Sequence, residues 1–341
     1  MKIQIDTLSK TPIYKQLVDW VRHAVKAGKA KPGDMLPSMN ELASKKGISR
    51  ETVKKAYAIL AKNGIIIPKQ GKGFYIAEPS ADGKQNVLVI FDKFSVYKQV
   101  IFNAFEKELG ERADITVLTH NQSLDLLNYF LDTHLDEFDW YVVSPHFPLD
   151  EESQEKARKL MARIPNRKLI MLDHWMKDVP GNYGAVFQDF ENDVYTGLEC
   201  GLDKILKAGQ LKVITLPESL YGPSIRKGIE RFASTYSVDV AFSYSTPETI
   251  EKGDIYLVLN SQLDWGLAAL ARKAAEQGLT IGKDVFIISY NDFELNDVVL
   301  GGLTTVSTDF ALMGRIAAGM ILKRELSKIH CDFGMRRRKT F

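Results

Sequence analysis

Short polar side chains follow several apolar segments of this 341-residue chain, at positions where buried strands would end. These residues are Asp92, Ser144, Asp173, Asn260 and Asn291, and the aromatic residues near them are Phe94, Tyr97, Trp175, Tyr221, Trp265 and Phe310. Carboxylates and amides form paired hydrogen bonds with hydroxyl groups, and aromatic rings cover the apolar C–H face of a sugar. The set predicts a carbohydrate site, although any single member could instead cap a turn.

A second group of side chains, nearer the amino terminus, is suited to nucleic acid. Arg50 can donate two hydrogen bonds to a guanine edge, while Ser49 and Thr52 can reach bases or phosphates. Lys54 belongs to the basic side of the same predicted helix. These residues predict a helix that enters the major groove of DNA through its amino-terminal turn.

Apolar spacing predicts the helices that would position this group. One helix is expected over 12–28 and a second over 38–47, and a third begins after Ser49. The second and third helices are separated by a short turn that contains Gly47. Two helices joined in this way, the second with a basic side, indicate a helix-turn-helix.

Two short strands are predicted directly after the third helix, at 65–67 and 74–76. In the turn between them, Lys69 and Lys72 can neutralise phosphates, and Gly71 lets the backbone approach the DNA closely. A two-stranded hairpin at this place makes the module a winged helix-turn-helix.

Charge is divided unevenly along the chain. Residues 1–78 carry 15 Lys and Arg against six Asp and Glu, a net charge of +9, whereas residues 79–341 carry 30 against 37, a net charge of −7. A basic module joined to an acidic body is expected when only the first part meets a polyanion. A Lys-rich solvated surface is the alternative.

The remaining sequence alternates strands with amphipathic helices. Near-continuous apolar runs predict strands at 86–91, 115–118, 140–143, 168–172, 212–216, 255–259 and 285–290. This alternation predicts doubly wound α/β sheets, in which ligands bind at the carboxyl ends of the strands. The polar segment 78–85 is expected to be a linker.

Residues 11–76 resemble the winged helix-turn-helix of the GntR family. The resemblance is carried by PIYKQL and by PGDMLPSMNELASKKGISRETVKKAYAILAKNGIIIPKQGKGFYI, in which turn, helix and wing follow one another in order. It implies a sequence-specific DNA-binding transcription regulator. By position, the family's DNA contacts fall on Asn40, Ser49, Arg50, Thr52, Lys54 and Gly71, with Asn40 standing where Arg is frequent.

The later sequence resembles the LacI-type effector domain, which has the two-subdomain fold of periplasmic sugar-binding proteins. The segments LIMLD, VLNSQLDWGLAAL, DVFIISYNDF and LTTVSTDFALMG carry the resemblance, which is strongest after residue 168. It implies that Asp173, Asn260, Asn291 and Phe310 contact the effector, with Asn291 standing where the family has Asp. Arg226 is the expected ligand-binding arginine, and Phe94, Tyr97 and Trp175 complete the predicted site.

The resemblance divides the chain into a DNA-binding domain (1–77), the linker (78–85) and an effector domain (86–341). One subdomain is expected to comprise about 86–188 with 309–325, and the other about 189–308 with 326–341. The basic run 336–339 is expected to be a solvated strand edge, with a second nucleic-acid contact as the alternative.

We expect a homodimer that binds palindromic double-stranded DNA and is controlled by a small carbohydrate, such as a monosaccharide. We expect repression that the ligand relieves, and activation stays open as the alternative. A phosphorylated sugar or another small metabolite stays open as the effector. No motif predicts catalysis, a metal or a cofactor, and two distant cysteines predict no disulfide. Without a long apolar run or a signal-like start, a cytoplasmic protein with no membrane partner is expected, which disfavours a transport protein. An aminotransferase-type partner domain is disfavoured by the short second part.

Overall fold

The computed structural model describes residues 5–6, 9, 11–77, 84–135, 137–215, 219–259 and 265–341. The chain forms two compact units, of which one comprises Met1–Leu88, Glu111–Thr116 and Asp132–Trp140, and the other Val89–Gly110, Val117–Leu131 and Tyr141–Phe341. Among the described residues, no helix combines the length and the apolar character needed to cross a membrane.

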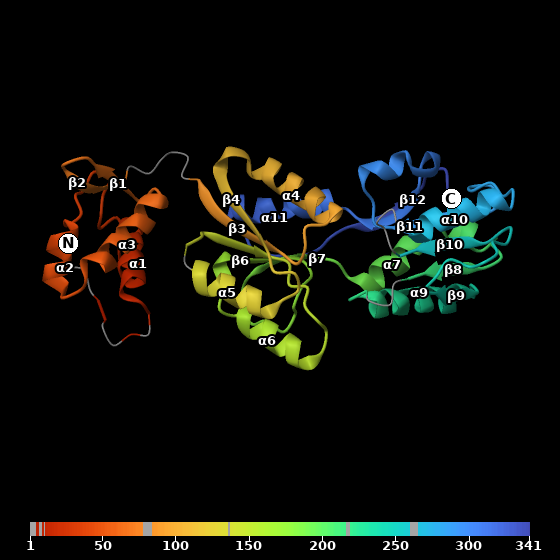
Figure 1. Ribbon diagram of the computed structural model, residues 1–341, viewed down its shortest axis with the longest axis horizontal. Coiled ribbons are helices and arrows are strands. Elements are labelled where there is room, and N and C mark those ends of the chain that lie inside the picture. Colours follow the sequence, from red (N-terminus) through yellow and green to blue (C-terminus); the bar gives the residue numbers. More distant parts are fainter. Residues whose placement is uncertain are drawn as a thin grey trace. The chain divides into compact units, whose positions relative to one another are not determined.

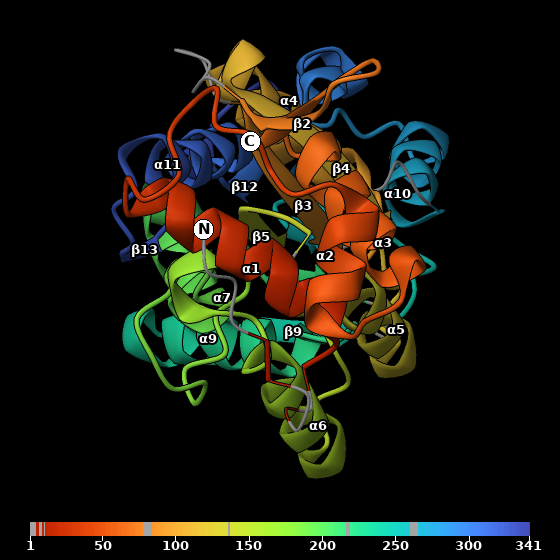
Figure 2. The same cartoon turned by 90° about the vertical axis from the view of Figure 1, so that its left-hand side faces the viewer.

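The amino-terminal module is a winged helix-turn-helix, as predicted. Its elements are α1 (Ile13–Lys26), α2 (Met39–Lys46), α3 (Arg50–Lys62), β1 (Ile66–Lys69) and β2 (Gly73–Ile76). The two strands pair antiparallel, and Figure 2 shows the three helices together. Leu17, Val53 and Leu60 lie in a continuous apolar core. Burial of one face of each helix therefore fixes the module.

The turn between α2 and α3 depends on a glycine and a cap. Gly47 has a φ of 62°, a left-handed conformation that costs other residues steric strain. The Ser49 hydroxyl accepts a hydrogen bond of 3.1 Å from the backbone N–H of Thr52 at the start of α3. These two residues set where α2 ends and where α3 begins.

The first subdomain is built on a six-stranded sheet with the order β13-β7-β6-β5-β3-β4. Its strands are β3 (Gln85–Phe91), β4 (Ala113–Thr119), β5 (Trp140–Val143), β6 (Leu169–Asp173), β7 (Gly184–Phe187) and β13 (Lys328–His330). Its helices are α4 (Val96–Leu109), α5 (Leu124–His134), α6 (Glu151–Met161) and α11 (Phe310–Lys323). In Figure 1, α4 and α11 cover one face of this sheet, and α5 and α6 cover the other.

The second subdomain is built on a six-stranded sheet with the order β14-β12-β11-β10-β8-β9. Its strands are β8 (Leu211–Ile214), β9 (Val240–Ser243), β10 (Ile255–Val258), β11 (Phe286–Tyr290), β12 (Thr304–Thr308) and β14 (Phe333–Arg336). Its helices are α7 (Phe190–Glu199), α8 (Leu202–Ile205), α9 (Gly222–Tyr236) and α10 (Trp265–Glu276). Only β14, at one edge, runs antiparallel to its neighbour. The doubly wound, two-subdomain prediction is confirmed.

The chain passes between the two subdomains three times, and we call these passages the crossovers. They lie after β7 at 188–189, after β12 at Asp309, and after β13 at 331–332. The backbone N–H of Cys331 donates to the Phe187 carbonyl at 2.9 Å, and that of Asp309 donates to the Asp332 carbonyl at 2.9 Å. These hydrogen bonds join the three crossovers to one another. The third crossover differs from the division expected near 326, because residues 328–330 pair with β7 of the first sheet.

Candidate functional site

A cavity of about 390 Å³ lies between the two subdomains, and we call it the central cavity. It is lined by Asp92, Lys93, Ser95, Tyr97, Lys98, Gln122, His146, Asp173, Gln188, Phe190, Thr215, Ser219, Leu220, Tyr221, Ile225, Leu259, Tyr290, Asn291 and Phe310. Many of these residues lie at the carboxyl ends of β3, β6, β8 and β11 or at the amino-terminal ends of α4, α7, α9 and α11. This is the edge at which a doubly wound sheet binds ligands.

Four buried ionisable side chains form the floor of the cavity, and we call them the buried charge cluster: Asp92, Lys98, His146 and Asp173. The Lys98 ammonium lies 3.1 Å from Oδ1 of Asp92 and also pairs with Oδ2 of Asp173. His146 Nε2 lies 2.9 Å from the same Asp173 oxygen. The lysine is thus enclosed by two carboxylates.

Burial and charge act in opposite directions on the pKa values in this cluster. Burial disfavours each charged form, but Lys98 and His146 overcome it at Asp173, whose pKa lies well below the ordinary range of an aspartate. In the same way Asp173 and Asp92 hold the pKa of Lys98 above its usual value. The two aspartates are therefore anions and the lysine is a cation at neutral pH.

Hydrogen bonds connect this cluster to the crossovers. The Gln188 amide donates to Oδ1 of Asp173, and its carbonyl oxygen accepts a 2.8 Å hydrogen bond from the Thr308 hydroxyl. Gln188 belongs to the first crossover, and Thr308 directly precedes the second. Both Asp173 oxygens are therefore engaged by protein donors.

The second subdomain supplies polar atoms that are still unpaired. Oδ1 of Asn291 and the hydroxyl of Tyr290 are buried and have no hydrogen-bond partner within the described part of the chain. Both residues line the central cavity, where a ligand hydroxyl could satisfy them. Asn291 and Asp173 share a left-handed backbone, with φ of 71° and 73°, which short polar residues tolerate best.

Aromatic rings enclose the cavity on two sides. Tyr97 stacks on Phe310 at 5.3 Å between ring centroids, and Phe190 stacks on Tyr221 at 4.1 Å. The Tyr221 hydroxyl lies 2.9 Å from Nδ1 of His146, a contact that joins the second subdomain to the first. Stacked rings beside unpaired polar atoms are the surroundings that a sugar needs.

The structure brings four of the eight predicted effector residues to the central cavity: Tyr97, Asp173, Asn291 and Phe310. Trp175 lines a neighbouring cavity of about 300 Å³, which shares Gln188, Phe190 and Tyr221 with the central one. Asn260 lies outside the described residues.

Arg226 and Phe94 are placed elsewhere, and neither lines the central cavity. Arg226 donates to Glu230 at 2.7 Å, one turn farther along α9, and its guanidinium lies over the Phe242 ring. Arg226 is therefore engaged within its own subdomain, and Asp173 pairs instead with Lys98. Phe94 is half exposed and makes edge contacts with Phe91 and Phe102.

Sequence reasoning missed Lys98, His146 and Gln188. A signal for Lys98 was present, because it continues the buried stripe of α4 that contains Ile101, Phe105 and Leu109. A lysine at a core position of an amphipathic helix implies a buried carboxylate partner. Nothing comparable marks Gln188, whose role depends on crossovers far apart in sequence.

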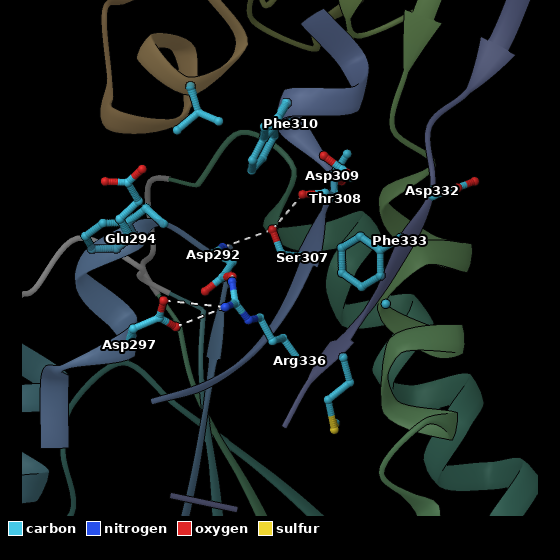
Figure 3. Close-up of a pocket in the computed structure, with 15 residues that line it drawn as sticks. Asp292, Glu294, Asp297, Ser307, Thr308, Asp309, Phe310, Asp332, Phe333 and Arg336 are labelled. Atoms are coloured by element: carbon cyan, nitrogen blue, oxygen red, sulfur yellow. Dashed lines mark hydrogen bonds and ion pairs between the residues drawn. The ribbon is translucent and has the colours of Figure 1, made fainter. Parts of the chain in front are cut away.

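Another cavity, of about 610 Å³, opens beside the second and third crossovers (Figure 3). Five carboxylates and one arginine are among its lining residues, and the arginine, Arg336, reaches two of the carboxylates, Asp292 and Asp297. Arg338 pairs with the same two residues, and only 9% of its side chain is exposed. The expectation of a solvated basic edge is therefore wrong for Arg338, because its neighbours include these carboxylates.

The predicted DNA contacts lie on the surface of the winged module, and all are exposed except Thr52, which is half buried. Ser49, Arg50 and Thr52 lie at the amino end of α3, and Lys54 makes a 3.4 Å surface ion pair with Glu51. Asn40 lies exposed near the start of α2, and Lys69, Gly71 and Lys72 lie exposed in or next to the β1–β2 turn. Helix and wing thus each present part of the set.

Known family models match one segment in each part of the chain. Residues 13–76 match the family of bacterial regulatory proteins of the gntR type, and residues 259–329 match the periplasmic binding protein-like domain. The chain is 46% identical over 76 residues to the HTH-type transcriptional repressor YtrA of Bacillus subtilis, covering 22% of this chain and 58% of the relative. It is 31% identical over 135 residues to the regulator TreR of the same organism, covering 38% and 50%. The chain spans about half the length of these curated relatives.

Solved structures show the same fold in the larger part. A dimeric Lac repressor superimposes with a TM-score of 0.58 at 16% identity, over 75% of this chain and 98% of the other. The trehalose repressor from Escherichia coli gives a TM-score of 0.58 at 15% identity, over 74% and 100%. At these identities the likeness establishes the architecture of two subdomains around a cleft.

Proposed function

Because the chain joins a gntR-type winged helix-turn-helix to a LacI-like, periplasmic-binding-protein-like domain, we propose that it is a DNA-binding transcription regulator controlled by a small effector. The observation that carries the proposal is the presence in one chain of two separate sites: a basic helix with a wing, and a polar, aromatic cavity between two subdomains. Neither site requires the protein to act as an enzyme.

The DNA contacts in this proposal are Asn40, Ser49, Arg50, Thr52, Lys54, Lys69, Gly71 and Lys72. Arg50 is exposed at the amino end of α3 and reads a base edge, whereas the lysines contact phosphates. The backbone N–H groups at the amino end of α3 also favour a phosphate. Two copies of the chain bind a palindromic operator, since one recognition helix alone gives little specificity.

The effector in this proposal is a carbohydrate bound in the central cavity. Its hydroxyls satisfy Asn291 and Tyr290, and its apolar face lies against Tyr97 and Phe310. Asp173 acts mainly by holding Lys98, His146 and Gln188 in place. The proposed domains correspond to these two functions. Residues 1–77 bind DNA, residues 78–85 form the linker and residues 86–341 bind the effector.

Binding of the effector and of DNA are coupled through the crossovers. Gln188 and Thr308 connect the cavity floor to two of them, so a ligand that favours one cleft geometry shifts the relative positions of the subdomains. Repression relieved by the ligand is the expected direction, in keeping with a repressor among the relatives.

Thermal-shift screening of the full chain against monosaccharides, disaccharides and their phosphates tests this function. A saturable rise in melting temperature for one saccharide is expected, since a ligand that binds only the native state stabilises it. Selection of DNA from a random pool should return a palindrome. Failure of every saccharide would contradict a carbohydrate effector, and failure to enrich any DNA would contradict the regulator itself.

A further inference from the structure

Lys98 occupies a place in the cavity floor that a ligand could fill. Its ammonium lies between Asp92 and Asp173, and it also lies 3.4 Å from the Ser144 hydroxyl and 3.4 Å from Nε2 of His146. Only 5% of the side chain is exposed, yet Lys98 is among the residues that line the central cavity. Two buried carboxylates without this lysine would form an ammonium-binding pocket.

We propose that Lys98 determines the charge of the effector: it supplies the ammonium group itself and restricts the cavity to ligands without net charge. This inference rests on the proposed carbohydrate function and narrows it, because it separates neutral sugars from amino sugars and sugar phosphates.

The charges around the cavity support a neutral ligand. The lining contains two carboxylates, Asp92 and Asp173, and two lysines, Lys98 and the exposed Lys93. The remaining ionisable groups include Tyr221 and Tyr290, whose pKa values burial raises, so both stay uncharged. His146 Nε2 contacts Asp173 and its Nδ1 contacts Tyr221, so both of its nitrogens already have partners. Within the described lining, therefore, no buried counter-charge is free for a charged ligand, since Lys93 is exposed to solvent, and an uncompensated charge in a buried site is costly.

Lys98 also competes with a cationic ligand for the two buried carboxylates. A ligand amine would have to displace an ammonium that is tethered to α4 and already positioned by Ser144, His146 and two carboxylates. An anion would instead approach the two carboxylates at close range. Each charged class is rejected for a different reason.

The first test uses the wild-type full chain and matched ligands. Calorimetry compares D-glucose, D-galactose and D-mannose with the 2-amino and 6-phosphate derivative of each. The tightest ligand should be a neutral sugar, and its charged derivatives should bind at least about tenfold more weakly, equal to about 1.4 kcal/mol. A charged derivative that binds as tightly as its neutral parent overturns the inference while leaving a carbohydrate effector in place. No binding by any of the nine compounds, together with no stabilisation by any disaccharide in the thermal-shift screen, contradicts both.

The second test removes the built-in ammonium. Lys98→Ala leaves Asp92 and Asp173 without their cation, so the variant should melt below the wild type, and n-propylammonium chloride should restore more of the loss than sodium chloride at equal ionic strength. Lys212→Ala is the matched control, because Lys212 pairs with the buried Asp254 at 2.5 Å but does not line the central cavity. Propylammonium should restore Lys98→Ala to a greater extent than Lys212→Ala.

Equal restoration of the two variants, or none for Lys98→Ala, overturns the inference. If Lys98→Ala fails to fold, Lys98→Met keeps the volume and removes the charge. That variant should gain affinity for the 2-amino sugars relative to their neutral parents, and an unchanged ratio overturns the inference.

Discussion

At the scale of single residues, Asp173 has two roles that cannot be distinguished from the sequence. It ends β6 in a left-handed conformation, and its carboxylate holds Lys98, His146 and Gln188 together. The sequence therefore indicated the right residue with an incomplete role. A hydroxyl-binding aspartate was expected, whereas the structure shows one whose oxygens are already occupied by protein donors.

The change Asp173→Asn tests this role through its dependence on pH. Because the folded-state pKa of Asp173 lies below its unfolded value of about 3.9, its contribution to stability is complete above that value and is lost as pH falls below it. At pH 7 the variant should lose about 3–5 kcal/mol of unfolding free energy, since a buried pair loses one partner. Denaturant titrations from pH 7 down to pH 3 measure the difference.

The difference in unfolding free energy between the wild type and Asp173→Asn should become smaller in the most acidic samples. Asp125→Asn serves as the control, because Asp125 pairs with Lys156 on the surface with 89% of its side chain exposed. That change should have little effect at any pH. A gap for Asp173→Asn that is small at pH 7 would contradict the role given to this carboxylate.

A second prediction for single residues compares the roles of Arg50 and Lys54 in DNA binding, since both side chains are exposed on α3. Arg50→Ala should weaken operator binding by about 1–3 kcal/mol and relax the preference at one base pair. Lys54→Ala should weaken all sequences alike and reduce the slope of log affinity against log salt by about one. Fluorescence anisotropy at several salt concentrations distinguishes the two. A uniform loss for Arg50→Ala, without relaxed preference, would mean that this helix reads DNA differently.

At the scale of elements, close packing of α4 against α11 fixes the wall that carries both Lys98 and Phe310. A Cβ added to Gly314 in α11 would lie 2.3 Å from the Ile101 carbonyl oxygen in α4, whereas one added to Gly319 meets no atom within 4 Å. Gly314→Ala should therefore cost about 1–3 kcal/mol of unfolding free energy. Gly319→Ala, in the same helix, should instead increase the unfolding free energy by up to about 1 kcal/mol. Urea unfolding of both variants tests this, and equal effects would contradict the packing.

The elements that could be predicted were those with a strong local pattern. All seven apolar runs became strands. Six of them are buried along most of their length, and a strand buried on both faces leaves a continuous apolar signature, whereas β4 is at most half buried. The apolar pattern missed five strands. Three of them, β9, β13 and β14, lie at sheet edges and are exposed or half buried, while β7 and β12 are buried but are short or rich in threonine. The prediction that Arg226 contacts the effector did not anticipate its ion pair with Glu230. This is a local i,i+4 contact, which a resemblance to a family does not reveal.

At the scale of the whole molecule, the proposed DNA-binding site and the proposed effector site share no residue. Such sites influence each other only through a difference in free energy between two states, and the influence is reciprocal. The crossovers are where both subdomains meet the charge cluster, through Gln188 and Thr308. We expect a homodimer, in which a change between subdomains alters the spacing of two winged modules. Sedimentation should give two chains per palindromic DNA, and one chain per site with undiminished affinity for a half-site would contradict this.

Control of DNA binding by the central cavity is tested most directly by operator affinity, measured with and without a saturating neutral saccharide. The DNA is the one returned by selection, and the saccharide is the one found by screening. The saccharide should change the dissociation constant for DNA by about 5- to 150-fold, which corresponds to a coupling of about 1–3 kcal/mol. DNA should change saccharide affinity by the same factor. Superimposable DNA-binding curves, measured while calorimetry shows the cleft occupied, would contradict the claim that this cavity controls DNA binding.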